Sequence, residues 1–159
     1  MHHTTLYGHV TDRADLAAAA ADVLAHGAAW PAPDLEWRLL LTAVGETFWE
    51  MFERYPGAAE LIRSLPAPPE AAVRRFAALR DALVAQGFAA DDALLALDIV
   101  ADLVIDTAAG LERLDRDAQV RAWAAAAPEI AEAVTARRGW YDRKLAIVLD
   151  GLAVRRSAR

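Results

Sequence analysis

The sequence of 159 residues contains no cysteine, so it can form neither a disulfide framework nor a thiolate metal site. No apolar run reaches the ~18 residues that a membrane-spanning helix needs. The chain opens on polar histidines and threonines, so no signal peptide is recognisable. These absences predict a cytoplasmic protein with no membrane segment and no metal or other cofactor.

Signals for strands and for catalysis are also missing. No long stretch alternates apolar and polar residues, whereas alanine, leucine, glutamate and arginine favour helix throughout. The sequence has no Ser-His-Asp arrangement, no glycine-rich phosphate loop and no Cys-His cluster. We therefore expect an all-α protein that is not an enzyme.

Charge of positive sign is scarce as well. The formal net charge is -6, and Lys144 is the single lysine. A protein that binds DNA by itself needs a basic face to neutralise phosphates. The acidic balance is therefore unexpected for a complete DNA-binding protein.

Turn and capping residues divide what remains into helices. Thr11 and Asp12 offer an N-cap for a helix that ends at Gly27. Two prolines in residues 28–33 forbid helix continuation and predict a domain boundary, and Asp34 is expected to cap the next helix. The expected helices cover about residues 3–9, 11–27, 34–54, 57–65, 70–86, 90–112, 116–126, 128–138 and 140–153.

The segment 90–112 is apolar on more than one face, so it must be buried on several sides. It nevertheless carries Asp98, Asp102 and Asp106 on one stripe, at positions i, i+4 and i+8. Unpaired buried carboxylates are costly. Two interpretations stay open: recognition of a cationic ligand, or pairing near a dimer seam with Arg113, Arg143 or Lys144.

The most specific motif stands at the start of the chain. Residues 4–13, Thr-Thr-Leu-Tyr-Gly-His-Val-Thr-Asp-Arg, resemble the recognition helix and the next helix start of the TetR/AcrR family of bacterial transcriptional regulators. Residues 56–61, 79–88, 90–98 and 149–152 are similar, in the same order, to the regulatory domain of that family. Since two further helices precede the recognition helix in the family, the resemblance implies a chain that starts inside its DNA-binding domain.

The resemblance also implies roles for individual residues of this segment. Thr4 and Thr5 match positions that contact bases or backbone, and Gly8 matches a variable position that often reads bases. The positions that contact phosphate are occupied by Tyr7, His9 and Arg13. Without the two preceding helices, the chain as given is expected to bind operator DNA weakly or not at all.

The resemblance divides the chain into a remnant of the helix-turn-helix domain, residues 1–27, and a ligand-binding and dimerisation domain, residues 34–154. Helices 90–112 and 140–153 are expected to pair with their copies in a second subunit as a four-helix bundle, which gives a homodimer. The predicted interface residues are Leu97, Ala101, Val104, Ala108, Leu145, Val148, Leu149 and Leu152.

A small-molecule cavity is implied among helices 34–54, 57–65, 70–86 and 90–112. Leu61 and Leu79 stand where tetracycline-binding members have polar partners, so an apolar or aromatic effector is expected rather than a metal-tetracycline complex. The predicted ligand-binding residues are Trp37, Leu40, Ala43, Thr47, Phe48, Leu61, Ser64, Leu65, Phe76, Leu79 and Leu83.

Together these observations predict a ligand-responsive transcriptional regulator of the repressor kind, with operator DNA as partner of the intact protein. The alternative is a naturally complete, helical, dimeric ligand-binding or interaction module without autonomous DNA binding.

Overall fold

The structure is a computed structural model that describes residues 12–113, 116–129 and 138–157. Every regular element in these ranges is an α-helix, which confirms the all-α prediction for the described part of the chain. The helices are α1 (Arg13–Gly27), α2 (Trp37–Arg54), α3 (Ala58–Arg63), α4 (Glu70–Ala85), α5 (Ala90–Arg113), α6 (Arg116–Ala126) and α8 (Gly139–Ser157). Among these residues, no helix is both long and apolar enough to cross a membrane.

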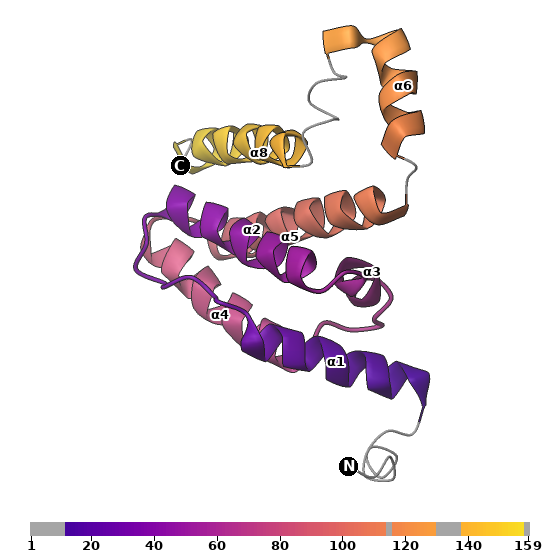
Figure 1. The fold of residues 1–159 in the computed structure, drawn as a ribbon. Helices are drawn as coiled ribbons and strands as arrows, with labels where there is room; N and C mark the ends of the chain where they lie inside the picture. The colour runs from indigo at the N-terminus through magenta and orange to yellow at the C-terminus, as the bar shows by residue number, and fades with distance from the viewer. Residues whose placement is uncertain (1–11, 114–115, 130–137, 158–159) are drawn as a thin grey trace.

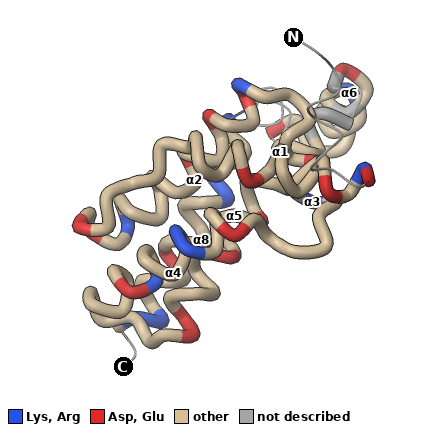
Figure 2. The backbone as a smooth tube through the Cα atoms, turned by 90° about the horizontal axis from the view of Figure 1, so that it is seen from below, with Lys and Arg blue, Asp and Glu red and all other residues tan. Residues whose placement is uncertain are grey.

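The helices stack around α5, as Figure 1 shows. α2 and α4 make the most extensive contacts with α5, while α3 and α8 also pack against it. α1 lies along α4 on the side of the molecule away from α8, and α6 leads away from the body. Figure 2 shows acidic and basic residues of the described helices interspersed over the molecule.

The core explains why α5 is apolar on more than one face. Leu97, Val100 and Val104 of α5 are completely buried, together with Leu40 and Leu41 of α2. Because α2, α3, α4 and α8 cover different sides of α5, its apolar residues cannot be confined to one stripe. The expectation that this helix is buried on several sides is confirmed.

The ends of α1 and α4 follow the capping residues of the sequence. The Asp12 carboxylate accepts hydrogen bonds from the N–H groups of Ala14 and Asp15, at 2.7 and 2.9 Å, and so caps α1 as predicted. Gly87, directly after α4, has a φ of 97°, in the left-handed region where glycine meets no Cβ penalty. Both ends were therefore predictable from single residues.

The predicted cap of α2 was wrong. Asp34 lies in a turn, and α2 begins after Glu36, whose carboxylate accepts from the N–H groups of Arg38 and Leu39 at 2.9 and 3.4 Å. Leu35 packs against the core, and its N–H donates to the Ala32 carbonyl at 3.5 Å. This contact delays the helix by two residues, and the longer Glu36 side chain reaches back to the free N–H groups.

The last helix extends beyond its predicted end. Arg155 donates to Asp92 at 2.8 Å, and Arg156 donates from Nε to the Gln86 carbonyl at 3.1 Å. The guanidinium of Arg156 also lies over the rings of Trp37 and Phe88. These contacts hold the last turn of α8 against the ends of α2, α4 and α5. The helices predicted at 3–9 and, for most of its length, at 128–138 lie outside the described residues.

One close approach joins α2 to α8. Tyr141 is 0% exposed, and its ring stacks on that of Trp49 with 5.3 Å between centroids. A Cβ at Gly45 would overlap the Tyr141 hydroxyl, so only glycine allows this contact. The hydroxyl has no hydrogen-bond partner among the described residues. Burial, and after it the carboxylates of Glu46 and Asp142, raises the pKa of Tyr141 far above its ordinary value.

Candidate ligand-binding cavity

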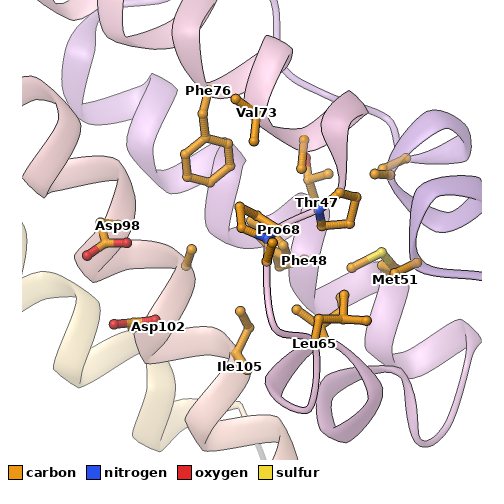
Figure 3. A pocket seen from close by; sticks show the side chains of 18 of the residues that line it. Thr47, Phe48, Met51, Leu65, Pro68, Val73, Phe76, Asp98, Asp102 and Ile105 are labelled. Carbon is orange, nitrogen blue, oxygen red and sulfur yellow. The ribbon is translucent and has the colours of Figure 1, made fainter. Parts of the chain in front are cut away.

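A cavity of about 710 Å³ lies between α1, α2, α4, α5 and the segment that joins α3 to α4 (Figure 3). Its wall is mainly apolar and combines aromatic, aliphatic and proline side chains with four charged ones. The wall includes Ala21, Ala25, Ala28, Trp30, Thr47, Phe48, Met51, Arg63, Leu65, Pro66, Pro68, Pro69, Phe76, Ala77, Arg80, Asp98, Asp102 and Ile105.

Three aromatic rings form one part of this wall. The ring of Trp30 lies edge-on to those of Phe48 and Phe76, with centroids 5.6 and 5.9 Å away, and the two phenylalanines lie 6.3 Å apart. The indole N–H of Trp30 donates to the Ala25 carbonyl at 2.8 Å. Because its polar atom is satisfied inside the protein, Trp30 presents apolar surface to the cavity and ties it to the end of α1.

Thr47 contributes little polarity to the wall. Its hydroxyl lies 3.0 Å from the Ala29 carbonyl and 2.9 Å from the Ala43 carbonyl, and it donates towards these backbone groups. The hydroxyl therefore holds the connection between α1 and α2 close to α2. The same side chain is predicted as a ligand contact, and its methyl group remains for that role.

Prolines shape the wall between α3 and α4. Pro66, Pro68 and Pro69 all line the cavity, and their fixed φ angles make this connection stiff. Directly after them, the N–H of Ala71 donates to the Asp22 carboxylate of α1 at 3.3 Å. The first turn of α4 is thus bonded to the helix that closes the cavity on the other side.

The two arginines of the wall already have carboxylate partners. Arg63 donates to Asp106 at 2.8 Å, and Arg80 donates to its neighbour Asp81 at 2.6 Å. Asp106 therefore pairs with an arginine of α3, not with the partners expected for this stripe. Lys144 instead donates to the Thr107 hydroxyl at 3.4 Å, Arg143 is exposed, and the side chain of Arg113 lies outside the described residues.

Asp98 and Asp102 line the cavity without an ion pair within the described part of the chain. Both residues are exposed. Partial burial nevertheless raises the pKa of Asp102, and the neighbouring charges of Asp98 and Asp106 add to the increase. No group of three or more histidine, aspartate or glutamate side chains in the described ranges has an arrangement suited to a metal ion.

The structure brings together four of the predicted ligand-binding residues. Thr47, Phe48, Leu65 and Phe76 line the cavity. Leu40, Leu79 and Leu83 lie in the core, and Trp37 packs on Phe88 with 5.4 Å between ring centroids. Seven predicted residues thus lie away from this wall: Trp37, Leu40, Ala43, Leu61, Ser64, Leu79 and Leu83.

Several residues of the wall carry no direct signal in the sequence. Trp30 and the three prolines stand between the predicted helices, where no apolar periodicity marks them. Ala21, Ala25 and Ala28 are too small to mark a binding surface by themselves. Met51 belongs to the apolar face of α2, where a cavity residue and a core residue look alike.

Most of the predicted DNA-binding residues lie outside the described part of the chain: Thr4, Thr5, Tyr7, Gly8 and His9. Arg13 is the first residue of α1 and is exposed. Since Asp12 already accepts from the N–H groups of Ala14 and Asp15, those two groups are not free to bind a phosphate.

Most of the predicted dimer residues are buried within the protomer, and Val148 is partly buried. Leu97 and Val104 have no exposed surface, and Ala101, Ala108, Leu145, Leu149 and Leu152 are also buried, with Val148 packed against the same cluster. Within the protomer, α8 covers α5 with these residues, so the predicted interface at these positions stays a prediction. The exposed large apolar residues of α8 are Ile147, 73% exposed, and Val154, 70% exposed.

Comparison with known proteins identifies solved structures that have a similar fold. No protein-family model and no curated protein matches the sequence. The structure of ActR, a TetR family protein of Streptomyces coelicolor in complex with actinorhodin, matches with a TM-score of 0.75 and 16% identity, over 96% of this chain and 80% of that chain.

Two further structures from the same source are similar. A possible TetR family transcriptional regulator from Streptomyces coelicolor A3(2) matches with a TM-score of 0.73 and 21% identity, over 98% of this chain and 83% of that chain. The transcriptional regulator SCO7222, a TetR from Streptomyces coelicolor, matches with a TM-score of 0.68 and 22% identity, over 97% and 83%. The chain therefore has the fold of TetR family regulators, which confirms the fold that the sequence resemblance implied.

Proposed function

We propose that this chain is a ligand-responsive transcriptional regulator of the TetR family, that it acts as a repressor, and that its effector binds in the cavity of α1, α2, α4 and α5. The observation that carries this proposal is the cavity itself, since α1 forms part of its wall and directly follows the segment that resembles a recognition helix. The role is one of binding, without a catalytic step. The likeness in fold to TetR family regulators supports it.

The cavity suits a small organic molecule. Its volume of about 710 Å³ lies within the usual range of ligand pockets, ~300–1,000 Å³. Aromatic rings on one side and prolines on another favour an effector with a large apolar or aromatic part. One fold neighbour, ActR, is described in complex with the small molecule actinorhodin, which supports a ligand role for such a protein.

The contacts of α1 suggest how binding is transmitted. α1 contributes only alanines to the wall, and it is held to α4 by the bond between Asp22 and the Ala71 N–H. A ligand that fits better when α1 is displaced shifts the population towards that displaced state. In a dimer, the two recognition helices must keep a separation of ~34–36 Å to reach successive major grooves. In a protein with a complete DNA-binding domain, movement of α1 would therefore weaken operator binding.

We propose that residues 1–27 belong to the DNA-binding part and residues 34–154 to the ligand-binding and dimerisation part. Arg13, exposed at the start of α1, would contact a phosphate through its guanidinium. The homodimer would form through the outer face of α8, with Ile147 and Val154, seven residues apart, on one helical stripe.

A pair of neighbouring substitutions tests the proposed site. Ala77 lines the cavity and is exposed, so Ala77→Trp fills space without displacing the core. Ala78 is also exposed on α4 but is not part of the wall, and Ala78→Trp is the matched control. Compounds are screened by the increase that they cause in the melting temperature of the wild type.

We expect compounds that stabilise the wild type and the Ala78→Trp variant but no longer stabilise Ala77→Trp. Hits that stabilise all three proteins equally would place binding elsewhere and contradict the proposed site. A broad apolar library without any hit would contradict the ligand-responsive function itself.

A further inference from the structure

The part of the cavity wall that α5 forms carries only negative charges. Asp98 and Asp102 stand one helical turn apart on α5 and both line the cavity. In Figure 3 they lie at one end of it, with Met51 towards the other end. Like charges at positions i and i+4 repel each other on a helix. The pair therefore costs free energy in the empty protein.

No basic side chain of the wall relieves this repulsion. The two arginines that line the cavity, Arg63 and Arg80, are engaged by Asp106 and Asp81 at 2.8 and 2.6 Å. These pairs are close to neutral as units, so the carboxylates of Asp98 and Asp102 dominate the charge that a ligand meets. A positive ligand group would remove the repulsion, and a negative one would increase it.

The environment of Asp102 also favours a positive ligand group. Burial raises the pKa of Asp102, and the charges of Asp98 and Asp106 raise it further. Both effects make ionisation of Asp102 less favourable than that of a free aspartate. A cation beside it would favour ionisation and gain binding free energy in return.

The aromatic part of the wall fits an organic cation rather than a bare ion. The rings of Trp30, Phe48 and Phe76 present apolar surface, and their faces attract the positive end of a ligand dipole or charge. Because the rings and the two carboxylates line the same cavity, a single ligand of suitable length can contact both. The cavity therefore combines an aromatic surface, which suits the apolar part of a ligand, with two carboxylates, which suit a positive group.

We propose that the cavity selects a cationic ligand, an aromatic or polycyclic amine whose ammonium group meets Asp98 and Asp102 while its ring system packs on Trp30, Phe48 and Phe76. This inference rests on the proposed function, because it specifies the chemical class of the effector of the same cavity.

Three probes with one ring system separate charge from shape. They are 1-naphthylmethylamine, which is a cation at pH 7, 1-naphthylmethanol, which is neutral, and 1-naphthoate, which is an anion. Isothermal titration calorimetry measures their dissociation constants for the wild type, for Ala77→Trp and for Ala78→Trp. We expect the amine to bind about tenfold more tightly than the alcohol, because two carboxylates favour it, and the anion to bind most weakly.

The charge variants are the double substitution D98N/D102N and the control Asp34→Asn. Asp34 is exposed in the connection between α1 and α2 and is absent from the wall, so its substitution also removes a carboxylate but at a distance. We expect the preference for the amine to fall to less than about threefold in D98N/D102N and to stay in Asp34→Asn. Binding should be lost in Ala77→Trp and kept in Ala78→Trp.

Two results would overturn the inference. If the alcohol or the anion binds the wild type as tightly as the amine, the cavity does not select charge, although sensitivity to Ala77→Trp would leave the proposed function standing. If none of the three probes binds, the cationic class is wrong, whereas the screen of Ala77→Trp against Ala78→Trp decides the proposed function separately.

Discussion

At the scale of single residues, the contact between Gly45 and Tyr141 decides how closely α8 approaches α2. Tyr141 is completely buried, and its hydroxyl has no hydrogen-bond partner among the described residues. Such a buried polar group usually costs ~1–3 kcal/mol. Its ring, by contrast, stacks on Trp49 and fills the space that Gly45 leaves.

Removing the hydroxyl is therefore expected to stabilise the protein. Tyr141→Phe should raise the free energy of unfolding by about 1 kcal/mol, because the ring packing stays and the unsatisfied group is lost. Gly45→Ala should lower it by about 1–3 kcal/mol through overlap with the hydroxyl. Urea denaturation measures both, and the double variant should lose less than Gly45→Ala alone. A Tyr141→Phe variant that is clearly destabilised would contradict this account.

The same residue predicts an alkaline loss of stability. The pKa of Tyr141 is raised in the folded protein by burial, so above pH 10, its ordinary value, the unfolded chain releases this proton while the folded chain retains it. The free energy of unfolding should fall as pH rises from about 10 through the folded-state pKa. Denaturation curves between pH 8 and 11 should show this slope in the wild type and a smaller one in Tyr141→Phe.

At the scale of elements, helix ends set by a single terminating residue were predicted better than ends that depend on contacts with other elements. Gly27 and Gly87 predicted the ends of α1 and α4, as the structure has them to within one or two residues. Asp34 did not cap α2, since a core contact of Leu35 shifted the start to Glu36. The end of α8 was also missed, because it depends on contacts of Arg155 and Arg156 with distant elements.

The cavity could be predicted only in part, because helical periodicity does not distinguish cavity residues from core residues. Aromatic residues at helical spacing marked Phe48 and Phe76, which do line the cavity. Leu40, Leu79 and Leu83 have the same character but fill the core. Periodicity identifies the apolar face of a helix, yet it does not say whether another side chain or a ligand covers that face. The contribution of α1 and of the proline segment depends on tertiary packing alone.

At the scale of the whole molecule, α8 offers the surface that we propose meets a second subunit. α8 is apolar on its inner stripe, which is used within the protomer, and carries Ile147 and Val154 on its outer one. Exposed large aliphatic side chains on one stripe favour an interface. The sequence could not separate the two stripes, because both contain leucine, isoleucine or valine.

The double substitution I147D/V154D should therefore dissociate the dimer. Two carboxylates placed in an apolar contact would be buried without partners, which strongly disfavours association. Light scattering after size exclusion should show the wild type at twice 17.2 kDa and the variant at 17.2 kDa. Val23→Asp, at a residue 71% exposed on α1, is the control and should remain dimeric. A variant I147D/V154D of unchanged mass would place the interface elsewhere.

The central claim is that a ligand in the cavity moves α1 within a dimer. Since the chain has no cysteine, Ala18→Cys gives one labelling site per protomer, on an exposed position of α1 outside the cavity wall. Double electron-electron resonance between two spin labels then measures the distance between the two α1 helices. The account predicts one defined distance without ligand, and a shifted one on saturation with a compound that passes the Ala77→Trp and Ala78→Trp comparison. Absence of any interspin distance, or a distance unchanged at saturation, would contradict it.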